Sequence, residues 1–308
     1  MINEISKLSS SIKIEAKKLG FFDCGISEVK FLSDDAEALE VYLEKGMNAG
    51  MEWLSLNFDK RTNPEKLLKN AKSVISVIYS YNSEDKPKDP AAPKISKYAF
   101  GKNYHKVLKD KLYLLLEVIR KMSVNCNARI FVDSGPVLEK AWARSCGIGW
   151  IGKHSLLINP LGGSYFFIGE IITDLVLEYD KPIEDKCYDC TLCIDSCPTS
   201  AITGKRTIDA NKCISYLTIE LEDKIPASFK GKLNNWVCGC DICQNICPWN
   251  KINVYDTESP FKPNPVMLEM KKKDWFMMDE ELFNKIFKGT SVERAGYKKI
   301  KSNLDFIK

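Results

Sequence analysis

Apolar residues recur at helical spacing in three stretches of the chain. The first covers residues 5–19, and Gly20 suits the end of that helix. A second helix is expected over residues 34–45, before Gly46, and a long third helix over residues 105–122. Asn63 followed by Pro64 has the pattern of a helix N-cap with proline in the first turn.

Runs of β-branched and aromatic residues predict the strands. Residues 74–79 and 128–132 have the composition of buried strands, and 155–158 and 165–172 form two more that are joined by a turn. The stretch 86–93 contains three prolines and is expected to be a loop, whereas 136–146 is expected to be helical. Helices and strands in this order predict an α+β domain.

Length and composition divide the chain into three parts. The 308 residues, 44% of them hydrophobic, suffice for one large domain and a smaller one. We expect an α+β catalytic domain over 1–179, a ferredoxin-like domain over 180–250 and a short, helical, basic segment over 251–308. The start of the chain lacks a basic region followed by an apolar block, and no apolar run is long enough to span a membrane, so a cytoplasmic protein is expected.

The positive charge is concentrated in two regions. The net charge is +4, but seven Lys and Arg residues lie between Lys285 and Lys308 against two acids. A second basic region runs from Lys86 to Lys109. Such regions are typical both of solvated surfaces and of contacts with nucleic acid, and the charge alone does not separate the two.

The chemistry is concentrated in a cysteine-rich stretch. Cys187, Cys190, Cys193 and Cys197 form a C-x2-C-x2-C-x3-C-P run, and Cys240, Cys243 and Cys247 repeat most of it. Cys213 lies between the two runs and brings the count to eight, the number that two 4Fe–4S clusters need. The last cysteine of each run crosses over to the other cluster in such pairs. We therefore assign one cluster to Cys187, Cys190, Cys193 and Cys247, and the other to Cys197, Cys213, Cys240 and Cys243.

Zinc and disulfide bonds explain the same cysteines less well. Structural zinc sites use paired C-x2-C knuckles and do not require three cysteines at this spacing followed by x3 and proline. Disulfide bonds need an oxidising compartment, for which the sequence gives no export signal. Cys238 does not fit the spacing of the second run and is not assigned as a ligand. Cys24, Cys126 and Cys146 are interpreted as small apolar side chains.

The first domain should use the electrons that the clusters carry. It has no G-x-G-x-x-G fingerprint and no P-loop, and two histidines, His105 and His154, are too few for a His-rich metal centre. A flavin or a corrinoid, held by backbone and pocket shape, remains. Asp133 follows a buried strand directly. It is interpreted either as the N-cap of the next helix or as a proton donor with a raised pKa.

The chain resembles the epoxyqueuosine reductase family over most of its length from about residue 60. The resemblance is carried by Phe100–Leu108, Val132–Ala143 with its Asp-Ser-Gly-Pro, Gly147–Lys153 with its Gly-Trp-Ile-Gly-Lys, and the cysteine segments 187–201, 213–218 and 240–250. It implies an N-terminal cobalamin-binding α/β-sandwich similar to corrinoid reductive dehalogenases, followed by a two-cluster bacterial ferredoxin-like domain.

The resemblance also implies roles for individual residues. Asp133 matches the family's proton donor, which favours the catalytic interpretation over the cap. Carried over by position, the cobalamin contacts are Arg61, Ser96, Asp133, His154, Leu157, Ile168, Ser215 and Asp241. His154 stands where asparagine is commoner in the family.

The implied substrate is tRNA with epoxyqueuosine at the wobble position, and the product is queuosine. The implied electron source is an external low-potential donor such as a flavodoxin or ferredoxin, and a monomer is expected. Longer members carry a C-terminal helical-repeat domain that is not present here, so the basic regions are the expected tRNA contacts. The alternatives are a corrinoid-dependent reductase of small molecules, similar to dehalogenases, and a simple electron carrier. Dehalogenases usually show a twin-arginine export signal, and residues 1–30 contain no arginine.

Overall fold

A four-stranded antiparallel sheet forms the centre of the first half of the molecule. The computed structural model describes residues 2–204, 206–251 and 260–308. The strands lie in the order β1–β2–β7–β4, and each neighbouring pair is antiparallel. Their bounds are β1 Asp23–Glu28, β2 Ser73–Ser80, β4 Ala128–Phe131 and β7 Phe166–Thr173. The central strands β2 and β7 are rich in Val, Ile and Phe because both of their faces are covered.

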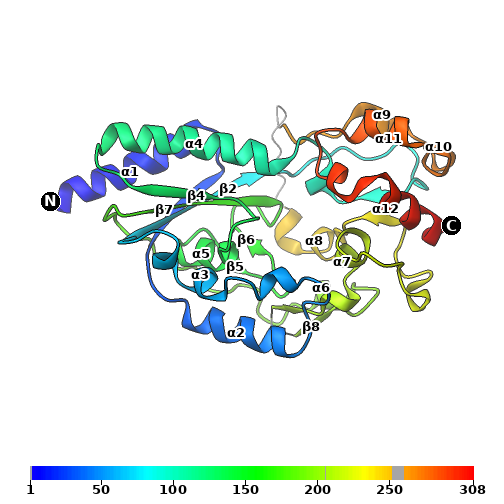
Figure 1. Cartoon of the computed structure of the whole chain (residues 1–308), viewed down its shortest axis with the longest axis horizontal. Coiled ribbons are helices and arrows are strands. Elements are labelled where there is room, and N and C mark those ends of the chain that lie inside the picture. Colours follow the sequence, from blue (N-terminus) through cyan, green and yellow to red (C-terminus); the bar gives the residue numbers. More distant parts are fainter. Residues whose placement is uncertain (1, 205, 252–259) are drawn as a thin grey trace.

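Helices cover both faces of this sheet (Figure 1). α1 (Ile2–Lys18) and α4 (Tyr104–Met122) lie over one face, and α5 (Glu139–Ser145) lies over the other. Side chains of β2 alternate between the two cores: Ile75 and Val77 pack with α1 and α4, and Val74 packs with α5. The face toward α5 also carries Glu170 of β7, since it pairs with Ser76. This face becomes important for the active site.

Shorter elements surround the α5 face. The helices are α2 (Ser33–Glu44) and α3 (Phe58–Thr62), and β5 (Trp150–Ile151) pairs with β6 (Leu157–Ile158) in a hairpin. Single 3-10 turns connect the elements throughout the chain. They are η1 Glu52–Leu54, η2 Pro64–Lys66, η3 Lys97–Ala99, η4 Ala210–Lys212, η5 Ala227–Phe229 and η6 Pro248–Lys251.

The cysteine-rich region consists of short elements and loops. Its helices are α6 (Leu192–Asp195), α7 (Ile214–Ile219) and α8 (Ile242–Asn245). Its strands are β8 (Ile202–Gly204), β9 (Thr207–Ile208) and β10 (Trp236–Cys238), and β10 pairs in parallel with β3 (Lys94–Ile95). The region has a small apolar core of its own, which includes Ile214, Leu217 and Trp236.

The C-terminal helices pack against segments from earlier in the chain. They are α9 (Pro265–Glu269), α10 (Lys272–Met277), α11 (Glu280–Phe287) and α12 (Val292–Ile307), and α12 is kinked where Gly296 adopts a φ of 78°. Trp275, Phe283 and Phe287 form one core with Val237 of β10 and with Ala92–Phe100. The tail therefore shares its core with the ferredoxin-like region and with the segment before α4.

Most of the predicted elements are present, with differences at their ends. The helices predicted over 5–19, 34–45 and 105–122 and the strands over 74–79, 128–132 and 165–172 are confirmed within a few residues. The helix predicted over 136–146 begins only at Glu139, and the strand over 155–158 is reduced to Leu157–Ile158 because Ser155 adopts a φ of 60°. Asn63 caps a 3-10 turn rather than an α-helix. The domain boundaries at 179 and 250 stay predictions. Among the described helices, none combines the length and the apolar character needed to cross a membrane.

Candidate active site and iron–sulfur cysteines

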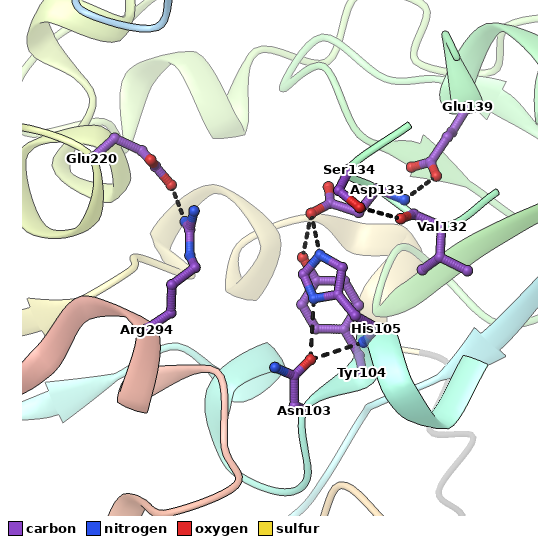
Figure 2. Close-up of polar contacts among 9 residues, drawn as sticks. All are labelled: Asn103, Tyr104, His105, Val132, Asp133, Ser134, Glu139, Glu220 and Arg294. Carbon is purple, nitrogen blue, oxygen red and sulfur yellow. Dashed lines mark hydrogen bonds and ion pairs between the residues drawn. The ribbon is translucent and has the colours of Figure 1, made fainter. Parts of the chain in front are cut away.

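Asp133 follows the C-terminal end of β4, and its side chain is directed toward the start of α4 (Figure 2). Val132 before it is buried, whereas the Asp133 side chain is 53% exposed. Its carboxylate Oδ2 accepts a hydrogen bond from Tyr104 Oη at 2.8 Å and lies 2.8 Å from His105 Nε2. The backbone of Asp133 is left-handed, with a φ of 54°, a conformation that is uncommon for residues other than glycine, although Asp and Asn adopt it more readily than most.

The start of α4 fixes the two side chains that hold Asp133. Asn103 is the N-cap, and its Oδ1 accepts the backbone N–H of His105 at 3.0 Å and lies 3.1 Å from His105 Nδ1. The Tyr104 ring stacks on the ring of Phe167 from β7, with centroids 4.3 Å apart and planes within 6°. The cap and the stacking therefore place both donors before any ligand arrives.

The geometry implies that His105 and Asp133 hold one extra proton between them. Both ring nitrogens face oxygen atoms, and Asn103 Oδ1 acts as an acceptor because it already receives a backbone N–H. Two such contacts require either a doubly protonated ring or a protonated carboxyl group. Burial raises the pKa of Asp133, but the hydrogen bonds from His105 and Tyr104 outweigh it, and the pKa is lowered overall.

Two expectations about Asp133 are wrong. It is not the cap of the next helix, because α5 begins only at Glu139 and has Leu138 at its N-cap. Its pKa is lowered rather than raised, because two side chains of α4 donate to the carboxylate. The placement of a hydrogen-bonded acid at the site is compatible with proton transfer, with His105 rather than burial as the source of the proton.

A further wall of the site comes from the C-terminal helices (Figure 2). Arg294 of α12 forms an ion pair with Glu220, which follows α7. The positive charge of Arg294 contributes, after the hydrogen bonds, to lowering the pKa of Asp133. The site is thus bordered by elements from the first and the last parts of the chain.

The predicted cobalamin contacts occupy several elements. Ser96 donates to Asp241, both are buried, and Asp241 also accepts the backbone N–H of Lys97 at 2.9 Å. Burial raises the pKa of Asp241. Arg61 is buried and donates to the carbonyl oxygens of Trp53 and Leu56. Burial lowers the pKa of Arg61.

The remaining predicted contacts are His154, Leu157, Ile168 and Ser215. His154 is buried, its Nδ1 accepts the backbone N–H of Leu156 at 3.3 Å, and burial followed by the charge of Lys140 lowers its pKa to about 4. It lines a cavity with Cys187, Cys190, Cys193 and Cys247. Leu157 of β6 is buried and Ile168 of β7 is partly buried, so both contribute packing. Ser215 of α7 donates its backbone N–H to Cys213.

The first set of cysteines surrounds that cavity. Burial raises the pKa of Cys193, and the thiolates of Cys187 and Cys190 raise it further. Burial likewise raises the pKa of Cys247 to about 11, and Cys187 and Cys193 act in the same direction. Cys247 is distant in sequence but lines the same cavity, as the crossover pattern requires.

The second set lies beside the first. Burial and then Asp241, Cys213 and Cys197 raise the pKa of Cys240 to about 12. The pKa of Cys243 is raised by burial and then by Cys240 and Cys213, with a smaller contribution from Cys193 of the first set. The two predicted sets are therefore neighbours. Their assignment to two clusters and the binding of iron by them stay predictions.

The residues present fit the two implied groups. Among the described residues no three His, Cys, Asp or Glu side chains are arranged to hold a single metal ion. A cubane instead takes one thiolate on each of four iron atoms. His154 Nε2 is buried and has no partner in the described part of the chain, at the wall of the first cysteine cavity. Arg61 retains N–H donors beyond its two backbone bonds, which suits the carbonyl groups of corrin amide side chains.

The other four cysteines are buried and form no disulfide bond, which is compatible with their interpretation as small apolar side chains rather than ligands. Cys238 of β10 lies in the C-terminal core, and burial raises its pKa to about 12. Cys126 contacts Thr173 Oγ1 at 3.4 Å, and Cys146 donates to the carbonyl oxygen of Val74 at 3.4 Å. Cys24 lies in the core under α1, and all twelve cysteines are free thiols.

Two family models match the chain. A 4Fe-4S double cluster binding domain matches residues 186–250, and a model described as epoxyqueuosine reductase QueG matches residues 61–134. A curated epoxyqueuosine reductase of Cellulophaga algicola is 47% identical over 307 residues, which covers all of both chains. The chain belongs to the epoxyqueuosine reductase family.

Solved structures of family members share the fold. Epoxyqueuosine reductase from Streptococcus thermophilus aligns with a TM-score of 0.88 at 29% identity, over 97% of this chain and 80% of that one. An epoxyqueuosine reductase in complex with a tRNA-Tyr epoxyqueuosine-modified stem loop aligns with a TM-score of 0.86 at 29% identity, over 98% and 80%. The α+β fold with a double-cluster ferredoxin domain is therefore confirmed.

Several residues of the site were not predicted from the sequence. Asn103, Tyr104 and His105 lie in a segment that carries the family resemblance, but their contact with Asp133 joins separate parts of the chain. Glu139 accepts the backbone N–H of Asp133, and Glu170 lies behind it. One signal was available: Glu170 is a lone acid within an apolar strand, and a buried acid of this kind needs a partner.

Proposed function

We propose that this chain reduces epoxyqueuosine to queuosine at the wobble position of tRNA. The observation that carries the proposal is the 47% identity with a curated epoxyqueuosine reductase over the full length of both chains. The reaction removes the epoxide oxygen as water, consumes two electrons and two protons, and leaves a carbon–carbon double bond. The protein must therefore supply electrons, protons and a place for the base.

The eight cysteines are proposed to bring in the electrons. Cys187, Cys190, Cys193 and Cys247 would bind one 4Fe–4S cluster, and Cys197, Cys213, Cys240 and Cys243 the other. Cys193 of the first set lies near enough to Cys243 of the second for its charge to raise the pKa of that thiol. This proximity supports a short electron path between the two sets. An external low-potential carrier such as a flavodoxin or a ferredoxin would load this path.

Cobalamin is proposed as the group that meets the substrate. Its binding residues would be Arg61, Ser96, Asp133, His154, Leu157, Ile168, Ser215 and Asp241. When bound, the corrinoid supplies the electron pair that opens the epoxide. Arg61 supports this role with its spare N–H donors, and Ser96 forms a buried polar pair with Asp241.

Asp133 and His105 are proposed to supply the proton to the opening oxygen. The pair holds one extra proton, and the half-exposed carboxylate is the member that faces outward. Asp133 would pass the proton to the oxygen that leaves, while Tyr104 and His105 hold the carboxylate in position. Asn103 would keep the ring oriented through Nδ1.

The tRNA is proposed to bind over the basic regions. Lys285–Lys308 and Lys86–Lys109 would contact phosphate groups, and binding would weaken as salt increases. A tRNA substrate places the reaction in the cytoplasm, and a monomer is the expected state. The alternative, a corrinoid reductase of small molecules, is not favoured by the full-length identity to an epoxyqueuosine reductase.

A gene deletion tests the function in the cell. Transfer RNA from the deletion strain is digested to nucleosides and analysed by mass spectrometry, with the wild-type gene and the Asp133→Asn gene returned on plasmids. We expect epoxyqueuosine to accumulate in the deletion strain and to disappear only with the wild-type gene. Normal queuosine in the deletion strain would contradict the proposal.

A further inference from the structure

Glu170 is an acid in the interior of the sheet. It lies on the central strand β7, is 0% exposed and is on the face toward α5. Ser76 Oγ of the neighbouring strand donates to its Oε1 at 3.5 Å, and its Oε2 receives no donor group from the described residues. The carboxyl of Glu139, from the start of α5, also comes within hydrogen-bonding reach of the Glu170 carboxyl.

This contact requires a proton. Ionised carboxylates are acceptors only, so two of them form a hydrogen bond only when one carries a proton. Burial followed by the charge of Asp133 raises the pKa of Glu139 to about 8. Burial followed by the charge of Glu139 raises the pKa of Glu170 well above its ordinary value. The pair therefore titrates as a unit that holds at least one proton at neutral pH.

The same pair is in contact with the loop of the active site. Glu139 Oε1 accepts the backbone N–H of Asp133 (Figure 2). This N–H belongs to the residue with a left-handed φ of 54°, which needs local bonds to hold it. A second bond, from Ser134 N to the carbonyl oxygen of Val132 at 2.6 Å, tightens the turn. Glu139 thus joins the loop to the interior acid.

We propose that Glu139 is a positioning residue for Asp133, and that the proton it shares with Glu170 keeps it in place. With the proton present, Glu139 bonds to Glu170 on one side and to the Asp133 N–H on the other. Without it, the carboxylates of Glu139 and the fully buried Glu170 repel each other, and Glu139 repels the Asp133 carboxylate as well. Glu170 in the sheet interior thereby controls, through Glu139, the orientation of the Asp133 loop. The catalytic consequence rests on the proposed function, whereas the proton sharing does not.

The surroundings of the pair set its response to pH. Lys140 and Asp133 face Glu139, with Lys140 Nζ bonded to the carbonyl oxygen of Ser155 at 2.8 Å. Cys146 at the end of α5 and Ser76 face Glu170. Because the folded pKa values are raised, the stability from this pair is full below the unfolded pKa of glutamate and is lost as pH rises through about 8.

The first test compares two substitutions of Glu139 in the cluster-loaded protein. Glu139→Gln keeps an oxygen for the Asp133 N–H and gains an N–H for Glu170, whereas Glu139→Ala has neither. We expect Glu139→Ala to lower kcat at least about 20-fold with KM within twofold, and Glu139→Gln to recover most of the loss. Hydrogen exchange in a peptide covering 132–138 should speed up in Glu139→Ala alone. Equal activity and equal exchange in the two variants would overturn the positioning role.

The second test follows the unfolding temperature from pH 5 to 8.5 and needs no substrate. Glu170→Gln gives Glu139 a permanent donor, so this variant should lose less stability across the range than the wild type. Glu117→Gln, an exposed change on α4, is the control and should follow the wild type. A Glu170→Gln curve parallel to the wild-type curve would overturn the shared proton. If the wild type converts no epoxyqueuosine, the proposed function fails while this curve still decides on the pair.

Discussion

His105 Nε2 lies 2.8 Å from Asp133 Oδ2 and connects the first turn of α4 to the loop after β4. The other ring nitrogen faces Asn103 Oδ1, which is the cap of the same helix. The helix start therefore fixes the ring, and the ring fixes the carboxylate. An acid that is half exposed and caps no helix of its own gains a defined direction in this way.

Replacing Asp133 by asparagine should abolish most turnover without removing the cofactors. The amide keeps the shape but cannot carry the proton, so we expect kcat to fall at least about 100-fold. Iron and cobalt content of the purified variant should equal that of the wild type. Asp110→Asn, an exposed change on α4, serves as the control. Wild-type turnover by Asp133→Asn would show that the proton comes from elsewhere.

Replacing His105 by glutamine should separate orientation of the carboxylate from supply of the proton. Glutamine can donate a hydrogen bond to Asp133 but carries no acidic proton. We therefore expect kcat of His105→Gln to fall at least about 10-fold with KM little changed. Wild-type turnover by His105→Gln would mean that His105 only orients the carboxylate.

The helices and the central strands were readable from the sequence because they carry periodic signals. The face of α4 with Leu108, Leu112 and Leu115 is an example, and the run Val74–Tyr79 is another. β1 was missed because Asp23–Glu28 has little β-branched character and lies at the edge of the sheet. There the partner strand, rather than local preference, decides the conformation.

The site was readable only in part, for a related reason. The cysteine spacing is a local pattern, and it sufficed to predict the double-cluster domain that the family model matches at residues 186–250. The state of Asp133 depends on Tyr104 and His105, which approach only when α4 packs beside β4. The contact of Glu139 with Glu170 likewise needs α5 to lie over β7. A single sequence does not state such distances.

Cys238 offers a test of the ligand assignment. It lies in the apolar core shared with the C-terminal helices, and its position does not fit the spacing of the two cysteine runs. Cys238→Ala should keep the full iron content and cost about 1 kcal/mol of unfolding free energy through a small cavity. Cys240→Ala should lose about half of the iron. Loss of iron in Cys238→Ala, or full iron content in Cys240→Ala, would show that the ligand assignment is wrong.

The basic tail offers a test of tRNA binding. Lys285 and Lys298 are exposed, so replacing both by alanine should weaken binding of an anticodon stem loop. If both contact phosphates, the slope of log K against log salt should decrease by about 2. A matched control is the double change Lys7→Ala and Lys17→Ala on α1, with the same loss of charge. Equal slopes in the two double variants would assign the effect to net charge alone.

The most direct test of the account is turnover by the purified chain. The protein is loaded anaerobically with iron, sulfide and cobalamin, reduced, and incubated with a stem loop that carries epoxyqueuosine, and the nucleosides are analysed by mass spectrometry. The account predicts queuosine, lighter than the substrate by one oxygen atom, and no product when cobalamin is omitted. Unchanged epoxyqueuosine with the fully loaded protein, or equal conversion without the corrinoid, would contradict it.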